Sequence, residues 1–118
     1  MDLATSSFGQ AFAPGSVVMV TLNLPREKFF GAIMAVSPAG VALRGVDLNS
    51  LEDFMRQVRE GDSVRPGAVF FPLHRVERME MDVRNADIPS MQERFETKTG
   101  RRFSEFFLAD VPSAGKPN

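Results

Sequence analysis

The chain has no cysteine, no tryptophan and no tyrosine, and it has only one histidine among its 118 residues. Without cysteine there is no disulfide framework, no zinc–thiolate site and no thiol nucleophile. No apolar run approaches the roughly 18 residues that a membrane span needs. The N-terminal stretch carries an acid where a secretory signal would carry positive charge, so we expect a cytoplasmic protein with no membrane association.

The chain also lacks an excess of charge of either sign. Lys and Arg together number 14, Asp and Glu number 15, and the formal net charge is −1. Proteins dedicated to duplex nucleic acid usually carry a strong basic excess, because contacts to phosphates supply most of their affinity. The balance of charge argues against that class. The 43% hydrophobic and 25% charged residues are typical of one ordinary globular domain.

Runs of β-branched and apolar residues predict five strands, at 16–24, 28–36, 41–48, 68–73 and 76–83. Gly31 inside the second run indicates a strong bend or a close backbone approach. The Ser-Pro-Ala-Gly sequence at 37–40 predicts a tight turn, since proline presets φ and glycine tolerates positive φ. The first three strands should therefore form a meander.

The pattern changes after the third strand, where apolar residues recur at a spacing of three and four: Leu51, Phe54, Met55 and Val58. This spacing predicts a helix over 51–60, inserted between the third and fourth strands. Ser50 followed by Asp53 is a plausible variant of the capping box, and Gly61 is a natural stop.

A second capping box, Ser90 with Glu93, and a stop at Gly100 predict a helix near the C-terminus. A short helix should follow, with an apolar stripe formed by Phe103, Phe106 and Phe107. This extension is a candidate surface for a protein partner. We divide the chain into three segments: an N-terminal arm or short helix (1–15), a small β-barrel with its inserted helix (16–88), and a helical C-terminal extension with a flexible tail (89–118).

The single histidine, His74, lies where the apolar alternation changes phase. Apolar residues alternate up to Leu73, and the next apolar residue is Val76, three positions on. A continuous strand would expose one of the two apolar sets, so the chain must turn locally between the fourth and fifth strands. Pro72 agrees with this, because proline cannot donate to a central ladder. We interpret His74 as a corner residue.

Catalysis by His74 would need an orienting carboxylate and a nucleophile or a positioned water. Glu77 and Glu80 are near in sequence but flank no nucleophile motif, and one imidazole is too few for a metal site. The chain also has no phosphate-binding loop and no nucleophile elbow. We therefore expect no enzyme, no catalytic residue, no metal and no cofactor.

Phenylalanine is abundant, with eleven residues, and adjacent pairs of it occur in two of the predicted strands. Adjacent residues of a strand point to opposite faces, so one ring of each pair should point outward and need a partner. Homo-oligomerisation is the economical explanation. The predicted interface residues are Phe70, Phe71, Met79 and Met81.

The second strand and the fourth-to-fifth strand corner resemble motifs of the Sm-like family. The run FFGAIMAV at 29–36 is similar to the first motif, with its strand glycine, and PLHRVERM at 72–79 lies where the second motif ends. Val76 and Met79 match the apolar pair that closes the second motif. The likeness covers about 16–83 and implies a mainly β fold, a strongly bent five-stranded small barrel. It also implies rings in which the edge strands of neighbouring subunits pair.

The positions that bind uridine or adenine in RNA-binding members of this family differ here. Ser37 stands where the family has an acid, and Gly40 with Val41 stands where it has a Met-Asn pair. Pro72-Leu73 replaces an Arg-Gly pair. Arginine stacks on bases and histidine also pairs with them. His74 and Arg75, at the corner between the fourth and fifth strands, are therefore candidates for a substitute polar pocket. The candidate ligand or RNA contacts are His74, Arg75, Ser37 and Arg44.

A second resemblance leaves an alternative open. AVSPAGVAL contains the Ser-x-x-Gly part of the cyclic-dinucleotide motif of PilZ domains, at 37–40. The arginine pair of that motif has no match, because Arg26 and Lys28 do not have its spacing. The sequence favours a non-catalytic, homo-oligomeric Sm-like module for binding or assembly, with RNA as a candidate partner. A PilZ-like cyclic-dinucleotide-binding module or a protein-interaction module is the alternative.

Overall fold

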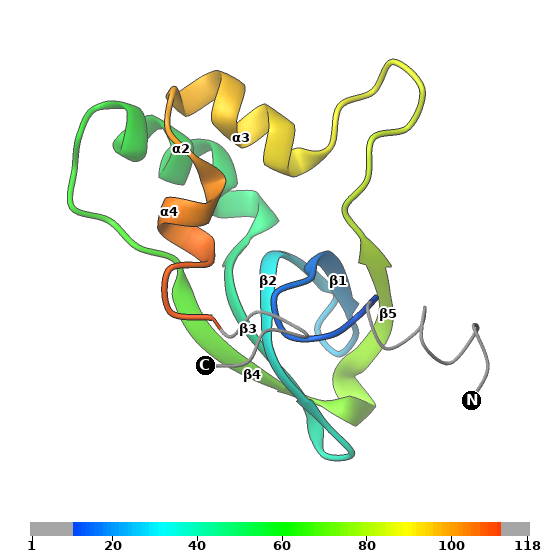
Figure 1. Cartoon of the computed structure of the whole chain (residues 1–118). Coiled ribbons are helices and arrows are strands. Elements are labelled where there is room, and N and C mark those ends of the chain that lie inside the picture. The colour runs from blue at the N-terminus through cyan, green and yellow to red at the C-terminus, as the bar shows by residue number, and fades with distance from the viewer. Residues whose placement is uncertain (1–10, 112–118) are drawn as a thin grey trace, which may run out of the picture.

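The computed structural model of the chain describes residues 11–111. Five antiparallel strands form one sheet in the order β4-β3-β2-β1-β5 (Figure 1). The strands are β1 (Val17–Leu22), β2 (Glu27–Ser37), β3 (Gly40–Asp47), β4 (Gly67–Pro72) and β5 (Val76–Met81). The prediction of a mainly β chain with five strands and a meander is confirmed.

The sheet is not closed into a barrel, so the predicted barrel goes further than the structure. Among the described residues, β4 pairs only with β3 and β5 pairs only with β1. Alternation and turn residues locate strands, but closure depends on strand tilt and register, which a local pattern does not specify. The 3₁₀ turn η2 (Leu73–Arg75) joins β4 to β5, as the phase change around His74 predicts.

At Gly31 the backbone of β2 leaves no room for a side chain beside β3. Gly31 lies opposite Gly45, and a Cβ built on Gly31 would be 2.1 Å from the carbonyl oxygen of Arg44. No side chain fits there, which explains the glycine inside a strand that is otherwise apolar. The register between β2 and β3 shifts between Ile33 and Ala35, and such a bulge adds to the bending of the sheet.

Two apolar clusters lie on the two faces of the sheet. One is formed by the strands alone, and we call it the inner cluster and its side of the sheet the inner face. Its buried members are Val18, Val20, Leu22, Ile33, Val41, Leu43 and Phe71. The other lies between the sheet and three helices (Figure 1). These helices are α2 (Leu51–Arg59), α3 (Met91–Thr99) and α4 (Phe103–Phe107). The predicted positions of all three helices are therefore confirmed.

The C-terminal helices are fixed to the sheet by phenylalanine rings. Phe30 of β2 lies 5.5 Å from Phe103 and 5.6 Å from Phe107, measured between ring centroids. Phe95 of α3 contacts both α4 rings edge-on. All four rings are buried, and each such pair contributes about 0.5–1.5 kcal/mol beyond the burial of its area. Much of the apolar stripe of the C-terminal extension is therefore covered by the chain's own sheet.

One of the two predicted capping boxes is present. At the start of α3, the N–H of Glu93 donates to the Ser90 hydroxyl at 3.1 Å, and the N–H of Ser90 donates to the Glu93 carboxylate at 2.8 Å. The predicted cap by Ser50 is wrong, because its side chain makes no capping hydrogen bond. A 3₁₀ turn, η1 (Leu48–Ser50), leads directly into α2 and leaves Ser50 in a helical conformation, with Asp47 capping that turn instead.

The predicted N-terminal arm and the predicted tail lie largely outside the described residues. No helix within 11–111 is long and apolar enough to cross a membrane.

Substituting Gly31 by alanine should lower the free energy of unfolding by about 1–3 kcal/mol, because the new methyl group would overlap the Arg44 carbonyl. Gly67→Ala is the matched control, since nothing lies within 4 Å of a Cβ there. Urea denaturation measures both variants. Equal midpoints for the two would contradict the close approach of β2 and β3.

The free energy of unfolding should also fall at acidic pH, because the cap of α3 uses the ionised carboxylate of Glu93. The hydrogen bond from the Ser90 N–H, aided by the charge of Arg84, lowers the pKa of Glu93. A carboxyl group whose pKa is lowered by folding stabilises the fold above its unfolded pKa, about 4.3, and loses this contribution as the pH falls through its folded value. Glu93→Gln keeps the acceptor without the charge. Between pH 7 and pH 3 the melting temperature should therefore fall less for the variant than for the wild-type protein. An equal fall in the two proteins would contradict this.

Candidate functional site

The structure brings two of the four candidate ligand residues to the same end of the sheet. Gly40 pairs with Pro72, and the N–H of Leu73 donates to the carbonyl of Ala39 at 2.9 Å. The β2–β3 turn carrying Ser37 therefore lies against η2 carrying His74. We call this end, residues 37–40 and 73–74, the tip surface. His74 is exposed there, while the Ser37 hydroxyl accepts a hydrogen bond from the Ala39 N–H at 3.1 Å within its own turn.

Arg75 points away from the tip surface and holds the β1–β2 turn. Its Nε donates to the carbonyl of Asn23 at 2.9 Å, and its guanidinium donates to the carbonyl of Pro25 at 2.7 Å. Its own carbonyl accepts from the Asn23 N–H at 2.9 Å. A carboxylate oxygen of Glu27 lies 3.9 Å away. The planar guanidinium satisfies two backbone carbonyls at once, so its chemistry here is positioning.

Arg44 lies nearer the helices and is not part of the tip surface. Its guanidinium donates to the carbonyl of Pro66 at 3.2 Å and forms an ion pair with Asp110. These bonds tie β3 to the segment before β4 and to the segment after α4. Ser37 and His74 thus share the tip surface, whereas the side chains of Arg44 and Arg75 are each engaged elsewhere.

The predicted interface residues divide between the inside and the outside of the sheet. The Phe71 ring points inward and lies 4.9 Å from Phe29, whereas Phe70 points outward and is 53% exposed. The Phe70 ring lies over Gly40, where an added Cβ would come within 2.8 Å of it. Met79 and Met81 of β5 are half-buried against the inner cluster. Only Phe70 of this set presents a large apolar surface to solvent.

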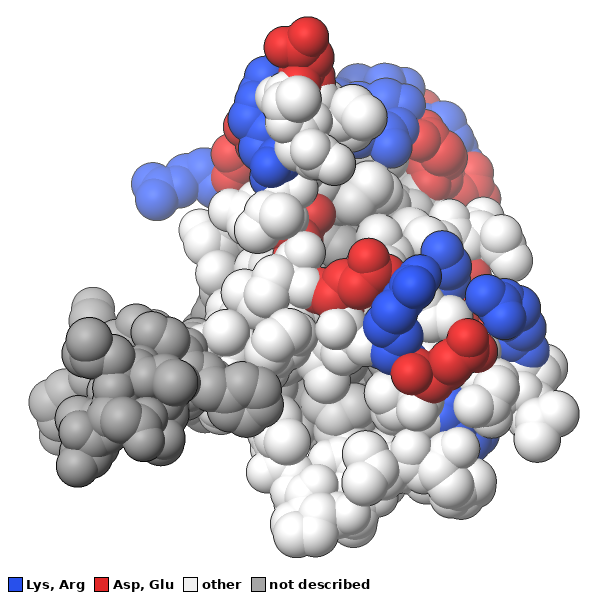
Figure 2. Space-filling view, turned by 90° about the vertical axis from the view of Figure 1, so that its right-hand side faces the viewer, with Lys and Arg blue, Asp and Glu red and all other residues white. Residues whose placement is uncertain are grey.

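Charges of both signs are interleaved along the β5 side of the molecule (Figure 2). Glu77 pairs with Arg26 at 3.5 Å, and Glu80 pairs with Arg78 at 3.1 Å. This side therefore offers no patch of one sign to a polyanion. Within residues 11–111 no three His, Asp or Glu side chains are grouped to hold a metal ion.

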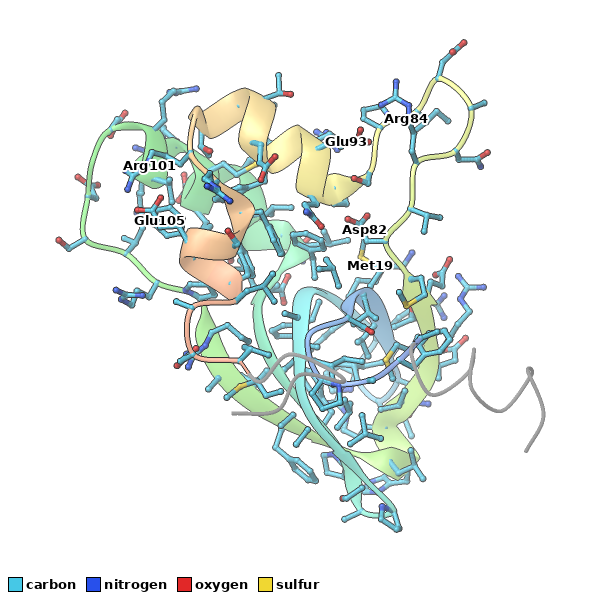
Figure 3. The ribbon with its side chains drawn as sticks, viewed as in Figure 1. Met19, Asp82, Arg84, Glu93, Arg101 and Glu105 are labelled. Carbon is cyan, nitrogen blue, oxygen red and sulfur yellow. The ribbon has the colours of Figure 1, made fainter. Side chains whose placement is uncertain are left out.

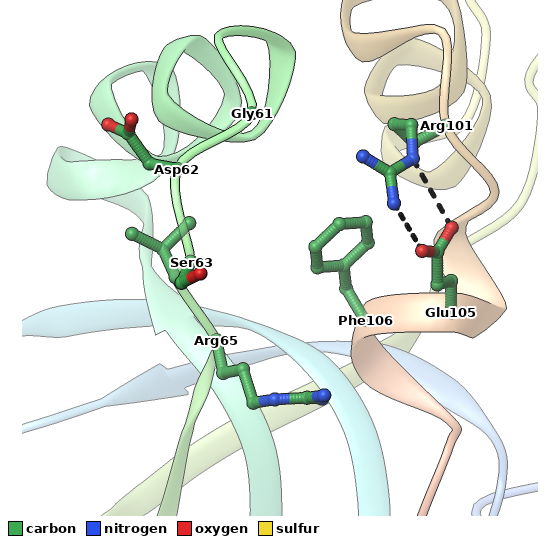
Figure 4. Close-up of a pocket in the computed structure, with 8 residues that line it drawn as sticks. Gly61, Asp62, Ser63, Arg65, Arg101, Glu105 and Phe106 are labelled. Atoms are coloured by element: carbon green, nitrogen blue, oxygen red, sulfur yellow. Dashed lines mark hydrogen bonds and ion pairs between the residues drawn. The ribbon is translucent and has the colours of Figure 1, made fainter.

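Sequence reasoning missed a groove between the α2–β4 connection and α4 (Figure 4). It has a volume of about 510 Å³ and is lined by residues 61–65 together with Arg101, Glu105 and Phe106. A second hollow of about 420 Å³ continues past Arg65 and Phe106 toward Asp110. We call the two together the α4 groove. Its walls lie about 40 positions apart along the chain, so no local pattern could have found it.

Three arginines from three different segments line the α4 groove. Arg101 lies over the Phe106 ring at 5.2 Å and pairs with Glu105, and Arg44 pairs with Asp110. Arg65 extends from the opposite wall across the groove, below the Phe106 ring in the view of Figure 4. Among residues 11–111 no carboxylate pairs with Arg65. Arg65 is therefore the unpaired cation of this groove.

No protein-family model matches the chain, and no curated protein or solved structure is similar to it at a significant level. The fold alone therefore defines its class: a mainly β chain whose single open sheet of five antiparallel strands is covered on one face by helices.

Replacing Arg75 by lysine should lower the free energy of unfolding by about 1.5–3 kcal/mol, because an ammonium group cannot serve both carbonyls in the same geometry. His74→Ala, one residue away and exposed, should change it by less than about 0.5 kcal/mol. Chemical denaturation of the two variants checks this. A tolerated lysine would show that Arg75 does not position the β1–β2 turn.

Proposed function

We propose that the protein is a non-catalytic, Sm-like assembly module, in which β4 of one copy pairs with β5 of the next copy to form a homo-oligomer. The observation that carries this proposal is the strand order β4-β3-β2-β1-β5, which leaves the two strands joined by η2 as the two open edges of one sheet. An open edge carries a row of unpaired backbone groups and is a template for another strand.

The geometry of the two edges supports a head-to-tail contact. Both strands are six residues long. Because η2 is a three-residue connection, the end of β4 and the start of β5 lie at the tip surface. The start of β4 and the end of β5 lie toward the helices (Figure 1). Copies in the same orientation would therefore place β4 and β5 antiparallel, and the contact could repeat into a ring.

Side chains favour one register of this pairing. Aligning Gly67 with Met81 places Val69 beside Met79 on the inner face, so that one apolar cluster continues into the next. The same register places Phe70 opposite Arg78 on the outer face, where a guanidinium can lie over the ring. The ring that is left exposed in one copy thus gains a partner.

Neither guanidinium of the ligand prediction supports nucleic-acid binding at the tip surface, because Arg75 and Arg44 already hold backbone carbonyls. The interleaved charges of the β5 side add no cationic track. Binding of RNA or a cyclic dinucleotide therefore stays a prediction of the sequence and does not enter the proposal.

Light scattering on the eluting protein tests the assembly, with a mass expected at a whole multiple of 13.1 kDa. Phe70→Lys should dissociate it, because the lysine would face Arg78 of the next copy. Phe70→Glu should retain it through attraction to the same arginine, and adding Arg78→Glu to Phe70→Lys should restore it.

Val36→Lys is the matched control for this series. Val36 is 52% exposed, like Phe70, but lies on β2 and not on either of the strands β4 and β5 that would pair between copies, so its substitution should leave the assembly intact. A monomeric wild-type protein would contradict the proposal. So would equal effects of lysine at the two positions.

A further inference from the structure

The segment between β5 and α3 forms a small hairpin that projects from the β5 side of the molecule (Figure 1). Asn85 and Ile88 exchange two backbone hydrogen bonds, at 2.9 and 2.8 Å, around a two-residue turn. Val83 is 65% exposed and Ile88 is 67% exposed. We call residues 83–88 the hairpin. It presents two of the most exposed large apolar side chains in the described part of the chain.

The hairpin is anchored at its base to the start of α3 (Figure 3). The two carboxylate oxygens of Asp82 accept from the N–H groups of Met91 and Gln92, at 2.8 and 2.9 Å, at the start of α3. Arg84 pairs with Glu93 of the same helix at 3.0 Å. A segment anchored in this way keeps its apolar side chains in one place in water, which is unfavourable unless another surface covers them.

The hairpin lies on the opposite side of the molecule from α4 and the α2–β4 connection, which border the α4 groove, and all of these lie at the helical end (Figure 1). The chemistry of the hairpin and that of the groove are complementary. The groove offers the partly buried apolar groups Val64 and Phe106 and the unpaired cation Arg65. The hairpin offers apolar Val83 and Ile88, and its turn carries Asp87, for which no ion pair exists among residues 11–111.

We propose that the hairpin of one copy docks into the α4 groove of the next copy, with Ile88 against Phe106 and Asp87 facing Arg65. The occupant is a second copy of this chain, and the inference rests on the proposed pairing of β4 with β5. The contact is heterologous, so every copy uses one hairpin and one groove.

The positions of both features along the chain support this occupant. The hairpin follows directly from the end of β5, and the groove wall at 61–65 leads directly into the start of β4. Antiparallel pairing brings the end of β5 of one copy beside the start of β4 of the next copy. The hairpin then reaches the groove of the neighbouring copy with no change in the conformation of either feature. The docked hairpin would set the angle between neighbouring copies, because it adds a contact outside the sheet.

Crosslinking at introduced cysteines tests the docking, since the natural chain has no cysteine to react. The variant with Ile88→Cys and Ser63→Cys places one thiol on the hairpin and one in the groove. Treatment with a short bis-maleimide should give a ladder of covalent multimers on a denaturing gel. Adding Phe70→Lys should abolish the ladder. The matched control, Ile88→Cys with Val36→Cys, should give no ladder.

The outcomes separate this inference from the proposed function. If light scattering shows an oligomer but the ladder is no stronger than in the control, hairpin docking is overturned while strand pairing stands. If the protein is monomeric by light scattering and gives no ladder, both are overturned. A charge swap then checks the polar contact: Asp87→Arg should weaken the ladder, and adding Arg65→Asp should restore it.

Discussion

The structure depends on β2 having apolar partners on both of its faces. Phe29 packs inward on Phe71, and the next residue, Phe30, packs outward on Phe103 and Phe107. Gly31 follows at once and lets β3 approach closely. A strand with apolar residues on both faces needs a covering layer on each face, and the layer over the outer face of β2 must come from elsewhere in the chain. The inserted helix α2 and the C-terminal helices supply that layer.

In this arrangement the two edges of the sheet are the places where another strand can pair. The strands that flank β2 are internal, so the two strands with unpaired backbone groups are β4 and β5. The helices cover the outer face of the central strands, whereas Phe70 on β4 remains outside their reach. The hairpin and the α4 groove sit next to these edges at the helical end. Assembly through the edges would use all of these exposed features together.

The strands and helices could be predicted from the sequence because each has a local signal. Period-two alternation and the three-residue step from Leu73 to Val76 located β4, η2 and β5, and the Ser90–Glu93 pair located α3. Ser50 failed as a cap because a 3₁₀ turn already fed α2, which its spacing to Asp53 does not reveal. The prediction that the sheet closes into a barrel was wrong for a different reason. Closure depends on bending that accumulates over five strands, which no local pattern specifies.

The candidate site was less predictable than the fold. Ser37 and His74 reach the same end of the sheet because β4 pairs with β3 and so brings η2 against the β2–β3 turn, a pairing that the predicted meander of the first three strands does not include. The roles of Arg44 and Arg75 depend on backbone carbonyls more than 20 positions away, and residue type alone does not show them. The α4 groove likewise forms between distant segments.

Hydrogen exchange of the backbone amides would reveal the pairing of β4 with β5 between copies. In an open edge strand only the amides facing the inner neighbour are bonded, so protection alternates along the strand. In a paired edge every amide is bonded. We expect continuous protection along 67–71 and 76–81, which becomes alternating on dilution to monomer. Alternating protection that does not depend on concentration would contradict it.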